Sequence, residues 1–281
     1  MNSMLNHGCT LQSMRRSFPS PRRLVKSTLV AGLLLLGASW NQAQILVSDD
    51  FSDGNDTDNP TWTRLSGYAG SSGQAWLVGG GTNIPNAYRL LAPNNGINGV
   101  GFVGSYTGPS IADGRVEVDF IQFGGPGANP VFGVAGRLNG DNGVGALTGY
   151  SYAYEPFAAG LAGELVLYRI NPGISITDLG SEQISLDPTK DYRFVLEFSG
   201  STISGRVFEI GGGLVAERTV TDSTYASGFS GVLGYSQTGV APTDFTADNF
   251  LVVVPEPGFG VLVVLGAMGL LAGRRLWQTR A

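Results

Sequence analysis

Cysteine and histidine are almost absent from this sequence of 281 residues. The single cysteine, Cys9, and the single histidine, His7, both precede the apolar run near the N-terminus. Residues 44–254 therefore contain neither type. This absence excludes disulfides, zinc sites built on Cys or His, Cys nucleophiles and Ser-His-Asp triads from that segment.

Positive charge is also scarce in residues 44–254. Nine Lys and Arg stand against twenty-one Asp and Glu, which gives this segment a net charge of −12. Such a surface repels DNA, RNA and anionic lipids, so we expect no nucleic-acid partner. The acidic residues either keep the protein soluble or bind calcium.

The first 43 residues follow the order of a signal peptide. Five basic residues precede the apolar run Leu29–Ala38, and small residues occur at Gly37, Ala38, Ser39 and Ala43. This order predicts export and removal of residues 1–43, with Met1 or Met14 as the start. An uncleaved membrane anchor is the alternative, although the apolar run is short for one.

The C-terminal 27 residues have three parts. Pro255-Glu256-Pro257 comes first, an uncharged apolar stretch at 258–273 follows, and a basic end at 274–281 carries Arg274 and Arg275. The apolar stretch is just long enough to predict a transmembrane helix. The arginines behind it would stay in the cytoplasm, so the preceding domain would lie outside.

This tail resembles the PEP-CTERM sorting signal of Gram-negative bacteria. The resemblance implies an exosortase-like enzyme as partner, which would cut near Pro255-Glu256-Pro257. It implies anchoring in the inner membrane before processing, then a place at the cell surface or in the extracellular matrix. It also implies an association with exopolysaccharide. A plain C-terminal anchor is the alternative.

Short strands are predicted throughout residues 44–254. Apolar residues alternate with others in 192–198, as in a strand with one buried face. Val116, Val118 and Phe120 alternate likewise, and a change of phase after them predicts a β-bulge near Phe120. The other predicted strands are Ala87–Leu91, Gly101–Tyr106, Val131–Leu138, Gly149–Tyr154, Glu164–Ile170, Gly205–Ile210, Phe229–Tyr235 and Thr246–Val253. Many short strands indicate a sandwich or barrel.

The two ends of this segment resemble concanavalin A-like and laminin G-like domains. The opening carries Asp49-Asp50-Phe51-Ser52-Asp53-Gly54 and Trp62, and the closing half carries Tyr225–Gly231 and Asp248-Asn249-Phe250. The resemblance implies an all-β fold, an antiparallel jelly-roll β-sandwich over residues 44–254. It also implies that the first and last strands lie side by side. Many members of these families bind glycans.

Acidic residues near both ends of the segment form a candidate calcium site. Asp49, Asp50 and Asp53 lie close together, and Asp248 would approach them if the terminal strands pair. Carboxylates supply the hard oxygen ligands that calcium prefers. The spacing does not match an EF-hand. The alternative is a solvated acidic turn.

Three tyrosines form a candidate glycan-binding face. Tyr150, Tyr152 and Tyr154 occupy alternate positions, so one strand would present all three on one side. Their rings would stack on sugars, with Trp62 as a further contributor. The alternative is aromatic packing between strands inside the sandwich.

A glycosidase motif is incomplete. Family-16 glycoside hydrolases carry Glu-x-Asp-x-x-Glu on one strand, and residues 117–122 resemble it up to Gln122, which cannot exchange a proton. We expect Glu117 and Asp119 to lie on a solvent-facing strand edge, and we assign no catalytic residue. The sequence thus favours an exported, non-catalytic module that is glycan-associated or structural. A jelly-roll glycoside hydrolase and a protein-binding adhesin are the alternatives.

Overall fold

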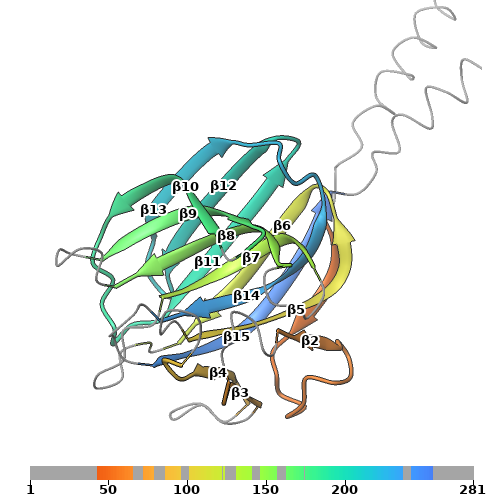
Figure 1. Ribbon diagram of the computed structural model, residues 1–281, viewed down its shortest axis with the longest axis vertical. Helices are drawn as coiled ribbons and strands as arrows, with labels where there is room; N and C mark the ends of the chain where they lie inside the picture. The colour runs from red at the N-terminus through yellow and green to blue at the C-terminus, as the bar shows by residue number, and fades with distance from the viewer. Residues whose placement is uncertain are drawn as a thin grey trace, which may run out of the picture. The chain divides into compact units, whose positions relative to one another are not determined.

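The computed structural model describes residues 43–65, 72–78, 86–95, 101–121, 123, 131–140, 146–156, 163–173, 175–236 and 242–255. These residues form two antiparallel β-sheets (Figure 1). The eight-stranded sheet contains β1 (Ala43–Asp49), β3 (Ala75–Val78), β4 (Tyr88–Ala92), β6 (Gly114–Phe120), β11 (Tyr192–Ser199), β12 (Thr202–Glu209), β13 (Leu214–Thr221) and β15 (Thr243–Pro255). The seven-stranded sheet contains β2 (Trp62–Arg64), β5 (Phe102–Ile111), β7 (Val131–Asn139), β8 (Thr148–Glu155), β9 (Glu164–Asn171), β10 (Ser175–Gln183) and β14 (Gly228–Tyr235).

The chain crosses repeatedly between the two sheets. The eight-stranded sheet has the order β13-β12-β11-β6-β15-β4-β3, and β1 also pairs with β15. The seven-stranded sheet has the order β10-β9-β8-β7-β14-β5-β2 (Figure 1). The first strand therefore lies beside the last, with Asp49 opposite Phe250. This confirms the predicted β-sandwich and the predicted pairing of its terminal strands.

Alternation of side chains explains why these segments form strands. In β11, Tyr192, Phe194, Leu196 and Phe198 are buried in the core, whereas Arg193 and Glu197 lie on the other face. Each of the ten segments predicted as strands overlaps a strand of the structure. The prediction succeeded because a strand with one buried face must repeat every second residue.

The predicted bulge near Phe120 is wrong in its position. β6 pairs with β11 without interruption from Gly114 to Phe120. The irregularity lies in the other neighbour, β15, where the register with β6 shifts between Asp248 and Leu251. Asn249 adopts a positive φ of 49° there. The change of phase after Phe120 instead marks the end of β6.

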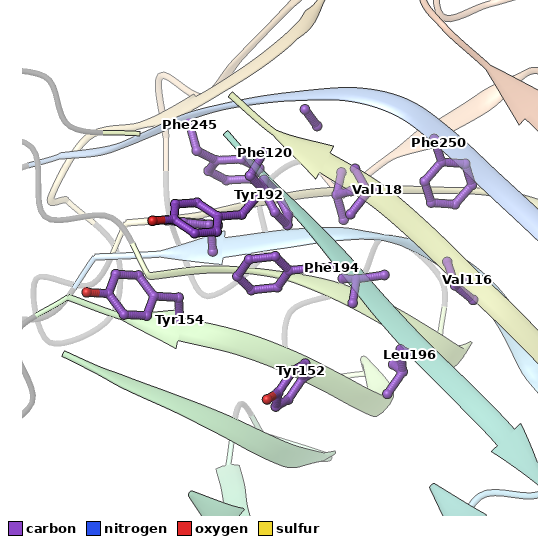
Figure 2. Packing of buried hydrophobic residues seen from close by; sticks show 14 of the residues in the cluster. Val116, Val118, Phe120, Tyr152, Tyr154, Tyr192, Phe194, Leu196, Phe245 and Phe250 are labelled. Atoms are coloured by element: carbon purple, nitrogen blue, oxygen red, sulfur yellow. The ribbon is translucent and has the colours of Figure 1, made fainter. Parts of the chain in front are cut away.

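Aromatic rings fill the space between the sheets (Figure 2). Phe120 and Phe194 of the eight-stranded sheet pack against Phe132 of the seven-stranded sheet, with ring centroids 4.6 Å and 5.7 Å from it. Phe245 on β15, which belongs to the eight-stranded sheet like Phe120, also stacks on Phe132. The rings are fully buried, so burial of their apolar surface holds the two sheets together.

The predicted end segments lie almost entirely outside the described residues. Within the described ranges, no helix is long and apolar enough to cross a membrane. The signal peptide, Glu256, Pro257, the helix predicted at 258–273, Arg274 and Arg275 are all in the part that is not described. Pro255 is the last described residue of β15 and pairs with Ala43.

Candidate functional site

The three tyrosines of β8 do share one face, but this face is the interior. Tyr150 and Tyr152 are fully buried, and Tyr154 is almost so. The ring of Tyr152 lies so close to Gly205 of the opposite sheet that a Cβ on Gly205 would be 2.4 Å from it. The prediction of an open sugar-binding face on β8 is therefore wrong. Alternation fixes which residues share a face, and here the larger residues face the core.

Trp62 is likewise a core residue rather than an exposed ligand contact. Its indole packs against Phe51, Tyr88 and Phe250, with ring centroids 4.8 to 5.6 Å away. Its Nε1 donates a hydrogen bond of 2.7 Å to Oδ2 of Asp49. Trp62 thus anchors the first strand to the core.

The structure does not assemble the predicted calcium ligands. Pairing of the terminal strands brings Asp49 and Asp50 near Asp248, and burial raises the pKa of Asp49 and Asp248, with neighbouring carboxylates acting in the same direction. Asp49, Asp50, Asp53 and Asp248 each accept a hydrogen bond from a nearby backbone N–H. In the described part of the chain, no three acidic side chains are grouped to hold a metal ion. These carboxylates stabilise local turns instead.

A cleft lies on the outer face of the eight-stranded sheet, and we call it the arginine cleft. Its volume is about 400 Å³. β6, β11, β12 and the turn after β12 supply its lining: Arg115, Glu117, Arg193, Val195, Arg206, Phe208, Glu209, Ile210 and Gly211.

Strand register arranges the outward side chains of this face in two rows. Each row crosses β6, β11, β12 and β13. The first row contains Asp119, Arg193, Phe208 and Leu214, and the second contains Glu117, Val195, Arg206 and Glu217. Polar and apolar groups therefore lie next to one another on the same face.

Guanidinium groups cover the carboxylates of β6. Arg193 donates to both oxygens of Asp119, at 2.7 and 2.9 Å, and this pairing raises the pKa of Arg193. Arg115 lies 2.6 Å from Oε1 of Glu117. The two arginine side chains are about half exposed, whereas Glu117 and Asp119 are buried beneath them. On this side of the cleft, the arginines are therefore accessible and Glu117 lies beneath them.

Arg206 occupies the centre of the second row. Its Nη2 donates to Glu197, and its Nε lies 3.5 Å from Oε1 of Glu217 without forming a hydrogen bond. This Nε is buried and has no hydrogen-bond partner among the described residues. The two carboxylates on either side balance the charge of the guanidinium.

Glu117 and Asp119 lie in the middle of the sheet, because β6 pairs with β11 on one side and with β15 on the other. The expectation of a solvent-facing strand edge is therefore wrong. Both carboxylates are engaged by arginines, and Asn249 also donates to Asp119 at 3.1 Å. Gln122, the third position of the glycosidase-like motif, lies outside the described residues.

A second group of carboxylates lies on the outer face of the seven-stranded sheet. Glu155 on β8 and Glu164 on β9 are directly opposite each other. Tyr168 and Tyr235 both donate to Oε1 of Glu155, which is buried. Burial, and then the charges of Glu155 and Asp178, raise the pKa of Glu164. The sequence does not reveal this pair, because the two glutamates lie on separate strands with no motif around them.

The arginine cleft was missed for a different reason. Arg193, Arg206 and Phe208 occupy the outward positions of strands whose inward positions carry the hydrophobic pattern. In a sequence, such positions are typical of an ordinary solvated surface. Only the pairing of β6, β11 and β12 gathers them into one cleft.

No protein-family model matches this chain, and no curated protein matches it either. Solved structures do match. A protein of unknown function with a galectin-like fold from Bacillus subtilis has 13% identity and a TM-score of 0.51, over 77% of this chain and 100% of that one. The exoplasmic/lumenal domain of VIP36, in a Ca²⁺/Man3GlcNAc-bound form, has 10% identity and a TM-score of 0.50, over 76% of this chain and 90% of that one.

A third match is LamA from Z. galactanivorans in complex with laminaritriose and laminaritetraose. It has 12% identity and a TM-score of 0.47, over 75% of this chain and 98% of that one. The galectin-like protein and VIP36, whose TM-scores reach 0.5, show the fold alone at this level of identity, and this fold is a jelly-roll β-sandwich. A fold alone does not decide what a protein does.

Proposed function

We propose that this chain is an exported glycan-binding module whose ligand lies in the arginine cleft. The mixed lining of the cleft carries the proposal, because a sugar ring has an apolar face and a rim of hydroxyl groups. Phe208 and Ile210 offer apolar contact, and Arg193 and Arg206 offer hydrogen-bond donors. Proteins of the same fold in sugar-bound form agree with this proposal.

The module is non-catalytic in this proposal. Hydrolysis of a glycosidic bond requires one carboxyl group as acid and a second as nucleophile or base. The two carboxylates that line the arginine cleft are both paired with cations, Glu117 with Arg115 and Glu209 with Lys190. In this proposal neither acts as an acid or a nucleophile.

Export and sorting complete the proposal. The sequence order of the N-terminal 43 residues and of the C-terminal tail supports secretion, anchoring by the helix at 258–273 and processing by an exosortase-like enzyme. The domain would then remain at the cell surface or in the matrix with exopolysaccharide. Replacing Pro255-Glu256-Pro257 with alanines should leave the protein in the membrane fraction. Release equal to that of the wild type would refute this part.

A polysaccharide screen tests the binding function. The full chain, purified in mild detergent, is run by affinity electrophoresis against a panel of polysaccharides, and new reducing ends are assayed in parallel. We expect retardation without new reducing ends, and weaker retardation for Arg206→Met. The matched control is Arg89→Met, because Arg89 lies on the same sheet in a pair with Asp244 but does not line the cleft.

A glycoside hydrolase is the second candidate, and the pair Glu155 and Glu164 favours it. Directly opposed residues of antiparallel strands have Cβ atoms about 5 Å apart, so both carboxyl groups are within reach of one glycosidic bond. Glu155 would attack the anomeric carbon while Glu164, whose pKa is raised, gives its proton to the leaving oxygen. Water would then release the sugar. New reducing ends that disappear in Glu164→Gln would establish this function in place of the first.

A further inference from the structure

We infer that the arginine cleft selects uncharged polysaccharide chains over acidic ones. This inference rests on the proposed glycan-binding function and names the class of glycan. Its basis is the state of the charged groups in and around the cleft, each of which already has a partner of opposite sign.

No cation of the cleft carries surplus charge. Arg115 pairs with Glu117, and Arg193 pairs with Asp119. Arg206 lies between two carboxylates, those of Glu197 and Glu217. At the end of β12, Lys190 donates to both oxygens of Glu209 at 2.8 and 2.9 Å. These pairs contain four cations and five carboxylates, so the local net charge is −1.

An acidic sugar would therefore meet an unfavourable field. An acidic sugar that binds Arg193 brings its carboxylate close to those of Glu117 and Asp119, and the like charges repel one another. Glu117 and Asp119 are buried, so water screens this repulsion less than it does between exposed acids. The net charge of −12 on residues 44–254 also slows the approach of a polyanion.

Hydroxyl groups suit the same cleft well. A hydroxyl both donates and accepts, so one hydroxyl bridges a guanidinium and a carboxylate without separating them. One donor is placed for this purpose. Nη1 of Arg193 lies 3.9 Å from Glu117, beyond hydrogen-bond distance, and the Arg193 side chain is 43% exposed. A sugar oxygen at this place would satisfy it.

The apolar end of the cleft fits an uncharged ring. Phe208 lies directly opposite Leu214, and Ile210 follows in the same hairpin. Leu214 and Ile210 are 53% and 44% exposed, although both are apolar. The row from Asp119 to Leu214 crosses four strands, which is about 14 Å at the usual strand spacing. A short stretch of chain would thus contact arginines at one end and the Phe208 ring at the other.

Matched polymers test this inference on the full chain. Each pair has one backbone and differs in charge: dextran and dextran sulfate, hydroxyethylcellulose and carboxymethylcellulose, pullulan and carboxymethylpullulan. Affinity electrophoresis is run at about 0.15 M salt, where long-range repulsion is screened beyond about 8 Å. We expect the neutral member of at least one pair to bind at least fivefold more tightly than its acidic counterpart.

Two substitutions locate the binding. Phe208→Ala and Arg206→Met should each weaken the neutral polymer at least fivefold. Leu77→Ala and Arg89→Met, which change exposed or paired residues of the same sheet outside the cleft, should leave it unchanged. Circular dichroism melts confirm that each variant is folded.

The outcomes separate the inference from the proposed function. Tighter binding of the acidic polymers, weakened by Phe208→Ala or Arg206→Met, overturns the inference and leaves glycan binding in place. If the neutral polymers bind both variants as tightly as they bind the wild type, the cleft is not the binding site. Absence of binding to every polymer overturns the proposed function itself.

Discussion

Arg137 and Arg206 show what one side chain does in two parts of this molecule. Arg137 is 1% exposed, and its guanidinium donates to the backbone carbonyls of Ala112, Gly200 and Tyr225 at 2.7 to 3.0 Å. It also lies over the ring of Phe198, 4.6 Å from the centroid. Arg206 is partly exposed and lies between carboxylates on the sheet surface.

The two arginines differ in how much of the surrounding structure depends on their hydrogen bonds. The three carbonyls come from three separate connections, those before β6, after β11 and before β14. Arg137 therefore ties together one end of the sandwich. The carboxylates around Arg206 are half exposed and reach water without it. A buried arginine with backbone partners stabilises the fold, whereas a surface arginine with paired charges remains available to a ligand.

The largest expected effect comes from Arg137→Met. This change removes the donors from three backbone carbonyls and the buried cation from Phe198, so the free energy of unfolding should fall by about 3–5 kcal/mol. Arg206→Met should change it by less than about 1 kcal/mol. Urea denaturation of both variants checks the comparison. Equal losses would mean that the two arginines have the same role.

Asp56→Ala tests a pair in which only one partner is buried. Asp56 is 2% exposed and accepts from Arg64, twice at 2.7 Å, and from the hydroxyl of Tyr88 at 2.9 Å. Its removal leaves the buried Tyr88 hydroxyl with Ser105 alone, so we expect a loss of about 2–3 kcal/mol. Arg64→Met should cost less in the same urea experiment, because Asp56 keeps its hydrogen bond from Tyr88 and the Arg64 side chain is about half exposed. A larger loss for Arg64→Met would contradict this ranking.

Asp222 is a further partly buried acid that is paired with an arginine, and its contribution to stability should depend on pH. Burial alone would raise the pKa of Asp222, but hydrogen bonds from Tyr150 and Thr224 and the charge of Arg169 outweigh burial and lower it to about 2. Because the folded-state pKa lies below the ordinary 3.8, its stabilisation is complete above about pH 4 and is lost as the pH falls toward 2.

The measurement compares wild type with Asp222→Asn from pH 6 to pH 2. The wild type should be more stable by about 1–2 kcal/mol at pH 6, after allowance for solvent screening, and this difference should shrink toward zero near pH 2. Taking the difference removes the titration of the other acids. A difference that does not vary with pH would show that the charge of Asp222 contributes nothing.

The sequence predicts the strands of this fold better than its sites. Strands with one buried face repeat every second residue, and all ten predicted strands are present. The edge strands were not predicted, because apolar and polar residues alternate less clearly in them. β10 contains polar residues on both faces, and β13 has few buried positions. β2 and β3 have only three and four residues, too few to show a period.

The site was harder to predict than the strands. Alternation of residues shows which side chains share a face of a strand, but it does not show whether that face points to the core or to solvent. Tyr150 and Tyr152 share a face, but it is the interior. The residues that alternate with Tyr150, Tyr152 and Tyr154 are Ser151 and Ala153, which are smaller, and this difference in size was the signal that the tyrosines pack in the core. Residues of the arginine cleft come from strands far apart in sequence, so only strand pairing reveals them.

The smallest effect is expected from removing one oxygen from Tyr152. This hydroxyl is buried and has no hydrogen-bond partner among the described residues, and burial raises the pKa of Tyr152. Tyr150, on the same face of β8, donates to Asp222 at 2.6 Å and accepts from the N–H of Tyr225 at 3.1 Å. Tyr150→Phe should therefore cost about 1–2 kcal/mol, whereas Tyr152→Phe should leave stability unchanged or raise it by up to about 1 kcal/mol. Both changes keep the ring in the core, so urea denaturation isolates the contribution of the hydroxyl. A loss on Tyr152→Phe as large as that on Tyr150→Phe would mean that a buried water satisfies this hydroxyl, and that partnered polar groups extend deeper into the core than Arg137 and Asp222 indicate.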